Sequence, residues 1–522
     1  MLSKAGGSGS LLLKVRRSFP RNSSFGKLPV ASSSTTAATF NSAQDSSAKR
    51  FDEIPGPKGL PFIGTLLDYR IGQYRPTTFH KALLDRHKQY GKIFKQKIMG
   101  RTTVHLLDPE FYRVWFQSED KTPHIVPLLE PVKIYRKKRN FAAGLGNSNG
   151  EEWYKVRSAI QQLMMRPKEV TEFFHMAEGV ATDFLERIRR IRDKNGEVGN
   201  FLNEAKKWTL ETSSMTCFEK RLGALECQPG SELQKTIDIN AASLDLSTKL
   251  YFSLPIYKYF STPAWRDLID KQDSFHGKAK ELVDATTTKI QDLMKKGELK
   301  DGQYGFMTYL LSRKDLEYKD AVIIALSLIG DGLITTSPAT VGQLYCLATN
   351  PAKQEKLYEE VCREAPKGEP LTSERINRMP YLKACVKEAF RFFPTGPDVK
   401  RVVMKDTMIG GYTIPKGTNL EMNNFALLRS SEYFDDPEDY LPERWLRGES
   451  AHNIHPYLLT PFGYGTRMCP GRRFAEQDMY IIITKLIQNF KIRWNSKEVL
   501  SQEYKMVFIP DRPATFAFLD RE

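Results

Sequence analysis

The residues best suited to chemistry lie in a glycine-rich loop at 461–473 that contains a single cysteine, Cys469. Apolar residues recur at helical spacing after the loop, so Cys469 lies just before an expected helix N-terminus. The helix dipole and the free backbone N–H groups at such a position favour a thiolate. Gly463 and Gly465 allow a tight turn against a flat ligand, and Arg467 supplies a positive charge that suits a ligand carboxylate.

A lone cysteine is most often a small buried hydrophobic residue. The glycines, the arginine and the expected helix start around Cys469 favour a ligand role instead. One cysteine cannot hold zinc, which takes about four ligands, whereas a single thiolate can be the axial ligand of haem iron. The six cysteines form no C-x-x-C pair, which argues against a zinc ribbon or a disulfide scaffold and fits a reducing compartment.

The pattern Phe-Gly-x-Gly-x-Arg-x-Cys-x-Gly at 462–471 resembles the haem-binding loop of the cytochrome P450 monooxygenases. The resemblance implies haem b as cofactor, with Cys469 as the axial thiolate ligand of its iron and with Phe462 and Arg467 in the haem site. Matching motifs occur in the family's order over residues 50–520. The fold implied is mainly α with a small β region, in one large haem-binding domain.

Hydrophobic periodicity predicts the same balance of elements. A helix is expected at 78–90, and most of the remainder up to residue 400 has helical period. Two short strands, 92–98 and 102–107, are expected to form a hairpin around Gly100. Further strands are expected near the C-terminus, at 490–494, 504–509 and 514–519.

The chain has 522 residues and a formal net charge of +16. That length can bury a large core. The excess of basic over acidic residues is compatible with binding to nucleic acid, to an anionic membrane or to an acidic protein partner. No concentrated basic tract with interleaved aromatic residues is present, so nucleic acid is the least favoured of the three.

Residues 1–44 contain six basic residues, many Ser, Thr and Ala, and no Asp or Glu. This composition predicts a mitochondrial transit peptide at 1–45, cleaved between Arg21 and Arg50. The alternative is a disordered basic tail. A proline-rich lead-in is expected at 46–64, followed by the haem domain at 65–522. The lead-in resembles the hinge of eukaryotic members, and the lack of an apolar anchor before it matches the mitochondrial class.

Trp153 and Arg157 lie one turn apart on an expected helix. Alone, such a pair is usually a surface arginine packed on a tryptophan. Here it resembles the family's haem-propionate helix, which implies that both side chains donate to a propionate. Arg401 matches a further propionate-binding arginine. Together, Arg157, Arg401 and Arg467 would neutralise two propionates.

Glu388 and Arg391 form an E-x-x-R pattern, which by itself indicates only a surface pair on a helix. The downstream segment Pro-Glu-Arg-Trp at 442–445 resembles the family segment whose arginine joins this pair. Glu388, Arg391 and Arg444 are therefore expected to form a buried charge cluster that fixes the segment leading to Cys469.

The longest apolar stretch, 321–348, contains a central acid and a group of hydroxyl residues, which favours a buried helix over a membrane span. In the family the corresponding helix crosses the haem face. Gly332 and Thr335 match its oxygen-binding motif, but Ile334 replaces the usual acid and Asp331 replaces a small residue. One hypothesis is that Asp331 and Thr335 relay protons. The competing one is that Asp331 contacts substrate or solvent and that water relays the protons.

Lys383 and Lys387 are four residues apart, and such lysines are usually solvated. The segment 382–388 nevertheless resembles the mitochondrial class, in which both lysines dock an acidic ferredoxin. Arg472 and Arg473, just past Cys469, fit the same face. Complementary charge of this kind mainly raises association rate and specificity.

The resemblance implies a mitochondrial, arthropod-like monooxygenase on the matrix side of the inner membrane, monomeric and compatible with peripheral membrane association. A [2Fe–2S] ferredoxin, fed by an NADPH-dependent reductase, would supply electrons. One oxygen atom of O2 would enter a lipophilic substrate, steroid-like or foreign, to whose binding 120–140 and 240–265 contribute. The alternatives are a haem-thiolate isomerase or peroxide-rearranging enzyme, for which Ile334 is the argument, a non-catalytic haem protein, and a structural helical protein in which the motif occurs by chance.

Overall fold

The computed structural model describes residues 48–447 and 454–521. The expected transit peptide at 1–45 lies outside the described residues, as do the first two residues of the expected lead-in at 46–64. The described chain is mainly helical with small sheets, as the sequence predicts.

The helix expected at 78–90 is α1, and most of the chain between it and residue 400 is helical, as expected. The α-helices are α1 (Phe79–Tyr90), α2 (Pro109–Ser118), α3 (Glu130–Lys138), α4 (Gly150–Met164), α5 (Pro167–Thr171), α6 (Phe174–Ile191), α7 (Phe201–Phe218), α8 (Glu232–Tyr251), α9 (Pro263–Lys296), α10 (Gly305–Ser312), α11 (Tyr318–Ile334), α12 (Thr336–Thr349), α13 (Pro351–Glu364), α14 (Ser373–Asn377), α15 (Pro380–Phe392) and α16 (Arg472–Asn489).

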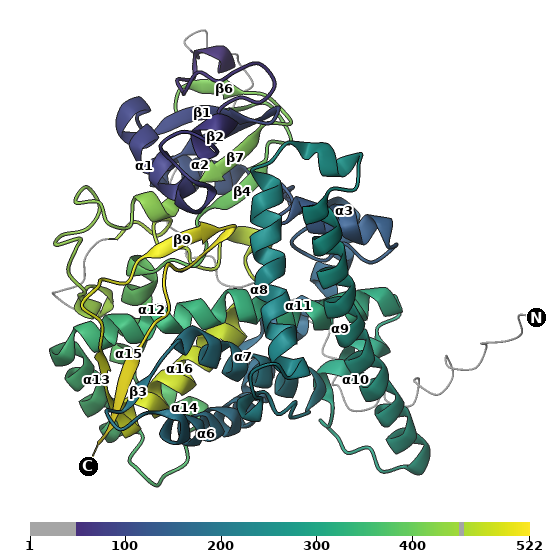
Figure 1. Cartoon of the computed structure of the whole chain (residues 1–522), viewed down its shortest axis with the longest axis vertical. Coiled ribbons are helices and arrows are strands. Elements are labelled where there is room, and N and C mark those ends of the chain that lie inside the picture. Colours follow the sequence, from purple (N-terminus) through teal and green to yellow (C-terminus); the bar gives the residue numbers. More distant parts are fainter. Residues whose placement is uncertain (1–47, 448–453, 522) are drawn as a thin grey trace, which may run out of the picture.

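The strands form one four-stranded sheet, one three-stranded sheet and two hairpins. Their bounds are β1 (Ile93–Ile98), β2 (Arg101–Leu106), β3 (Glu197–Val198), β4 (Val399–Val402), β5 (Thr407–Ile409), β6 (Tyr412–Ile414), β7 (Asn419–Met422), β8 (Phe490–Trp494), β9 (Gln502–Lys505), β10 (Val507–Pro510) and β11 (Phe516–Asp520). The sheet β1-β2-β7-β4 lies at one end of the molecule, and most helices lie at the other (Figure 1).

The expected hairpin around Gly100 is present: β1 pairs antiparallel with β2. Met99 and Gly100 both have positive φ, 51° and 76°, as a two-residue hairpin turn with the twist of the flanking strands requires. The prediction of a single strand at 504–509 is wrong. This segment belongs to a second tight hairpin, β9–β10, in which the chain reverses at Met506 with φ 61°. The alternation of apolar residues runs through this turn, so the period alone does not reveal the reversal.

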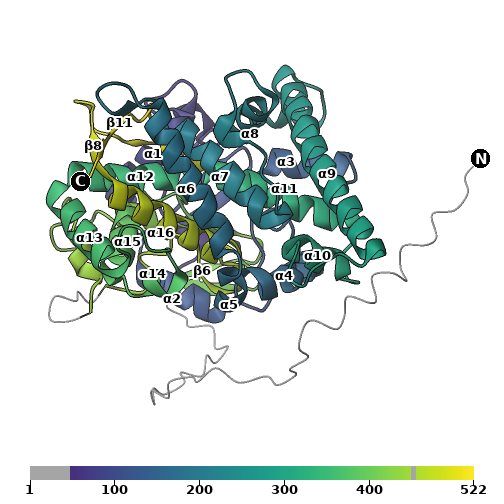
Figure 2. The same ribbon diagram turned by 90° about the horizontal axis from the view of Figure 1, so that it is seen from below.

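The apolar stretch expected to be one helix is two, α11 and α12, which meet at Thr335. Thr335 has φ −124° and ψ −58°, outside helical geometry. Within the described residues, the helical stretch Tyr318–Thr349 is long and apolar enough to cross a membrane, but 61% of its most apolar part is buried. It packs against α7, α9 and α15 and is therefore a core element (Figure 2).

Candidate active site

The cysteine loop is held by its own backbone. The Cys469 N–H donates to the Phe462 carbonyl at 2.8 Å. Gly463 and Gly465 have φ 72° and 71°, where a β-carbon would be strained, so glycine is required at both turns. Helix α16 begins at Arg472, three residues past the cysteine, which is the expected position.

The surroundings of Cys469 act on its thiol in two directions. Its side chain is accessible to solvent, yet desolvation raises the pKa of the thiol to about 11. Backbone N–H groups of Gly471 and Arg472 act in the opposite direction, as does Arg157. The helix start therefore favours the thiolate, as expected, but is not sufficient for it. A coordinated metal ion would supply the missing stabilisation, because metal-bound thiols are deprotonated.

Three arginines converge beside the cysteine loop. Arg157 Nη1 donates to the Met468 carbonyl at 2.7 Å, next to Cys469, while its buried Nε has no partner. The Arg467 guanidinium lies 4.1 Å from the centre of the Trp153 ring and donates to backbone carbonyls of 123, 145 and 148. Burial and the charges of Arg401 and Arg157 lower the pKa of Arg467 to about 9. Mutually repelling guanidinium groups of this kind form a site for anions.

The third arginine has a partner that the sequence did not reveal. Arg401 Nε donates to Glu119 Oε1, and Arg401 Nη2 donates to the Tyr464 carbonyl at 3.1 Å. Burial raises the pKa of Glu119, and Arg401 opposes that shift. Glu119 lies 282 residues from Arg401 in the sequence, so no local pattern could have indicated the pair.

These residues fit haem. Cys469 offers one thiolate, and its loop has the backbone freedom to approach a flat ring. One carboxylate, Glu119, against three buried or half-buried arginines leaves an excess of two positive charges, which matches two propionates. Arg157, Arg401 and Arg467 would hold the propionates, and Phe462, packed edge-on against Phe390 at 5.5 Å, would lie beside the ring.

The break between α11 and α12 is fixed by a side chain. Thr335 Oγ1 donates to the Asp331 carbonyl at 2.6 Å and replaces a backbone donor of the helix. A β-carbon on Gly332 would lie 2.7 Å from Thr209 Cγ2, so glycine lets α7 pack closely at the break. Ile334 is half-buried and packs against an apolar cluster, so the usual position of the family's acid lies beside hydrophobic side chains here.

Asp331, near the end of α11, lies close to the cysteine. Its residue is accessible, yet desolvation raises the pKa of its carboxyl to about 6 and its charge acts on the thiol. Arg136 of α3 opposes this shift, and burial lowers the pKa of Arg136 to about 10. Arg136 Nη1 donates to the Ala143 carbonyl at 2.7 Å. The sequence indicated only that the segment 120–140 contributes to substrate binding. A helical pattern does not show which arginine points toward the protein interior.

Glu388, Arg391 and Arg444 form a cluster that is buried away from solvent. Glu388 accepts from Arg391 Nη2 at 2.8 Å and from Arg444 Nε at 3.0 Å, and all three side chains are at most 1% exposed. Trp445 Nε1 donates to the other carboxylate oxygen at 2.8 Å. The arginines also donate to backbone carbonyls of residues 428, 435, 436, 437 and 439, so the cluster holds the segment that leads to the cysteine loop.

The basic residues of the expected docking face lie on the packed helices α15 and α16. Lys387 is exposed, whereas Lys383 is half-buried and donates to Asn377. Arg472 pairs with Glu476 at 3.0 Å, and Glu476 also acts on Lys383, so these two cations are neighbours. Arg473 donates to a backbone carbonyl at 3.1 Å and stays exposed.

Asp398, whose direction the sequence left open, points into the four-stranded sheet. Its Oδ2 lies 3.5 Å from Lys400 Nζ, which lies 3.5 Å from Glu421 Oε1. All three side chains are buried. Because neighbouring residues of a strand face opposite ways, Asp398 and Lys400 lie on the other side of β4 from Arg401 and do not belong to the candidate site.

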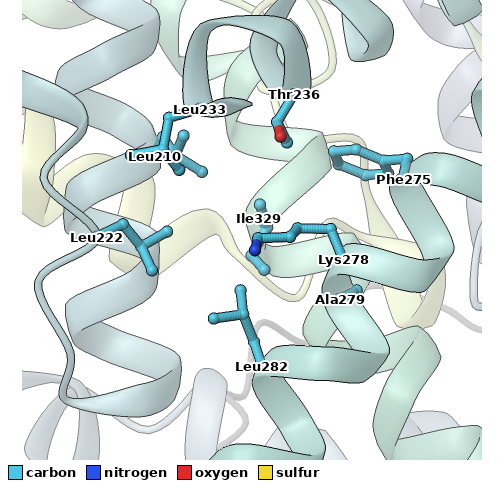
Figure 3. A pocket seen from close by; sticks show the side chains of 9 residues that line it. All are labelled: Leu210, Leu222, Leu233, Thr236, Phe275, Lys278, Ala279, Leu282 and Ile329. Atoms are coloured by element: carbon cyan, nitrogen blue, oxygen red, sulfur yellow. The ribbon is translucent and has the colours of Figure 1, made fainter. Parts of the chain in front are cut away.

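A separate recess lies between α7, α8, α9 and α11 (Figure 3). Its lining is apolar apart from Thr236 and Lys278, and it includes Ile329 of α11. Ile329 and Asp331 are two residues apart on a helix and so face nearly opposite directions. The recess is therefore distinct from the space beside Cys469 and offers none of the expected ligands.

Comparison with known proteins gives one family. A family model described as Cytochrome P450 matches residues 54–518. A probable cytochrome P450 CYP44 of Caenorhabditis elegans is 36% identical over 484 residues, covering 91% of this chain and 95% of its own length. The mitochondrial 1,25-dihydroxyvitamin D(3) 24-hydroxylase of Mus musculus is 31% identical over 484 residues, with 91% of both chains covered. The probable mitochondrial cytochrome P450 301a1 of Drosophila melanogaster is 31% identical over 526 residues, covering 98% of this chain and 94% of its own.

Proposed function

The chain belongs to the cytochrome P450 family of haem-thiolate monooxygenases, and from this premise we propose that it is a mitochondrial, ferredoxin-dependent member acting on a lipophilic substrate. The observation that carries the proposal is the placement of Cys469 just before α16, beside three arginines and close enough to Asp331 of α11 for that charge to act on the thiol. Bound haem supplies the dioxygen chemistry, with the thiolate donating electron density that favours O–O cleavage. Family membership gives the reaction class, monooxygenation.

The chain's own residues would divide the work between two sides. On one side the loop holds Cys469 through its N–H to the Phe462 carbonyl, and Arg157, Trp153, Arg401 and Arg467 orient the propionates. On the other side, Thr335 keeps the helix open, and Asp331 would hold a proton on its carboxyl and pass it toward the Thr335 hydroxyl. The apolar faces of α7 and α11 exclude bulk water from this side.

Two measurements on the full chain test the proposal. The reduced, carbon-monoxide-bound protein should show the Soret signature of a thiolate-ligated haem. Reconstitution with a mitochondrial ferredoxin, its reductase and NADPH should then support oxidation of at least one member of a panel of steroids and foreign lipophilic compounds. A thiolate signature with turnover that needs no ferredoxin would favour the isomerase or peroxide-rearranging alternative, which Ile334 supports by removing the usual acid.

Charge reversal at Lys383 and Lys387 is expected to slow reduction by ferredoxin about tenfold at low salt, because an acidic partner would be repelled. The difference should shrink as salt rises, since exposed charges are screened. Stopped-flow reduction of the haem by reduced ferredoxin measures this rate.

The control for this double variant is Lys295→Glu with Lys296→Glu. It reverses the same number of lysine charges, both of them exposed, at the far end of α9, away from α15 and α16 (Figures 1 and 2). An unchanged rate in the Lys383 and Lys387 variant, or an equal fall in the control, would remove the docking assignment.

The relay hypothesis predicts that Asp331→Asn lowers product formation about a hundredfold and diverts electrons to hydrogen peroxide. Asp331→Glu, which keeps a carboxyl, should retain more of the product yield. Product and peroxide are measured per NADPH consumed in the reconstituted system. Undiminished product without extra peroxide would favour the competing hypothesis, in which Asp331 contacts substrate or solvent and water relays the protons.

Location and substrate follow from the resemblance. We infer a transit peptide at 1–45, a lead-in at 46–64, a haem domain at 65–522, and a monomer on the matrix side of the inner membrane. Two exposed aromatic residues before α9, Tyr259 and Phe260 at 81% and 71%, favour peripheral contact with the membrane. The mouse relative is described as acting on 1,25-dihydroxyvitamin D(3), which favours a steroid-like substrate over a foreign compound. The arthropod origin stays a prediction, because the relatives include nematode, mollusc and vertebrate proteins.

A further inference from the structure

An acidic side chain lies among the arginines expected to bind the haem propionates. Glu119 is the C-cap residue of α2, and its side chain is 6% exposed. Its Oε1 accepts from Arg401 Nε and from Trp115 Nε1, the latter at 3.0 Å. A buried carboxylate with two donors, one of them cationic, is held in a single position and stays charged far more readily than an isolated one.

The position of this carboxylate is fixed against the cysteine loop. A β-carbon on Gly465 would lie 3.1 Å from Glu119 Oε2, so the carboxylate reaches the backbone of the loop itself. Arg401, its partner, also donates to the Tyr464 carbonyl at 3.1 Å in the same loop. The negative charge of Glu119 also acts on Arg467. Glu119 thus faces the loop and two of the three arginines at once.

We propose that Glu119 is a positioning residue for the haem propionates: it orients Arg401 and cancels one of three positive charges, and its buried negative charge lowers the haem reduction potential. This proposal rests on the proposed function only in requiring haem bound at Cys469. Without Glu119, three arginines would face two propionates, with one cation in excess. With it, the four side chains and two propionates balance.

The sign of the effect on the potential follows from electrostatics. Reduction of ferric to ferrous haem adds one negative charge, which a nearby carboxylate disfavours. A buried charge is poorly screened, so its influence extends beyond contact distance. Removal of the Glu119 charge should therefore make reduction easier. A purely structural role for the side chain would leave the potential unchanged once haem is bound.

The test is a potentiometric titration of the full-length haem protein with chemical mediators, without ferredoxin or substrate. In Glu119→Gln, which keeps the shape and an acceptor oxygen, the ferrous form should be favoured about tenfold, a rise of about 59 mV for a one-electron couple. Asp120→Asn is the matched control, since it removes the neighbouring exposed acid and should shift the equilibrium less than twofold. An unchanged or lowered potential in Glu119→Gln overturns the proposal.

A second variant keeps the test decisive if Glu119→Gln takes up no haem. Glu119→Asp retains the charge with a shorter side chain. Haem uptake by Glu119→Asp with a potential near that of the wild type supports a requirement for the charge, and loss of haem there overturns it. Failure of the proposed function would look different: the unaltered protein would lack the thiolate signature or ferredoxin-dependent turnover, whereas failure of this proposal leaves both intact.

Discussion

Replacement of Cys469 by alanine is expected to abolish the thiolate Soret signature of the reduced, carbon-monoxide-bound protein and to lower turnover by about three orders of magnitude or more. Three of the other cysteines are unsuited to take its place. Cys217, Cys346 and Cys385 are buried in the hydrophobic core, where desolvation raises the pKa of each thiol. The spectrum reports ligation directly and does not depend on the choice of substrate.

The matched control is Cys346→Ala in α12. It removes one sulfur from the buried core and leaves the loop intact, so the thiolate signature should persist with only a modest loss of stability. Haem uptake by Cys469→Ala with an unaltered thiolate signature would show that another residue ligates the iron. A lost signature in both variants would point to a general folding defect instead.

The sequence could indicate the candidate site where its signals are local. The glycine loop and the helix start are contiguous, and so are the residue types at 388–391 and 442–445. Helix and strand types followed from the hydrophobic period. The break at Thr335 and the turn at Met506 did not follow, since each depends on one residue's dihedral angles within an unbroken apolar pattern. Sequence periodicity records which face is buried and not where the backbone departs from regular geometry.

Contacts between distant segments could not be predicted from the sequence for a different reason. Glu119, at the C-cap of α2, and Arg136, in α3, are ordinary charged residues in the sequence, and only tertiary packing turns them toward Arg401 and Asp331. The same packing gave Asp398 its partners in the four-stranded sheet. The role of a charged residue cannot be read from the sequence, because most charged residues are solvated. Burial has the largest effect on the free energy of a charged group, and burial is a property of the fold.

The buried cluster behind the cysteine loop gives the largest expected effect on stability. Glu388→Gln keeps the shape of the side chain but removes the carboxylate that, among the described residues, pairs with both Arg391 and Arg444. Two guanidinium groups would then be buried without a counter-charge, which typically costs about 3–5 kcal/mol. That is a large share of the roughly 5–15 kcal/mol that stabilises a folded protein. Urea unfolding of the haem protein, followed by tryptophan fluorescence and Soret absorbance, should show an earlier transition.

Glu443→Gln is the matched control, because Glu443 is next to Arg444 in sequence but differs in environment. Its carboxylate pairs with Lys353 and Lys356 at 3.0 and 2.9 Å, and these side chains are 28% to 50% exposed. Partly solvated pairs of this kind contribute about 0–1 kcal/mol, so the control should unfold near the wild-type midpoint. In Glu388→Gln, Soret absorbance should be lost at a lower urea concentration than tryptophan fluorescence changes, because the cluster holds the segment that precedes the cysteine loop. Equal midpoints for the two variants would show that the buried carboxylate contributes no more than the exposed one.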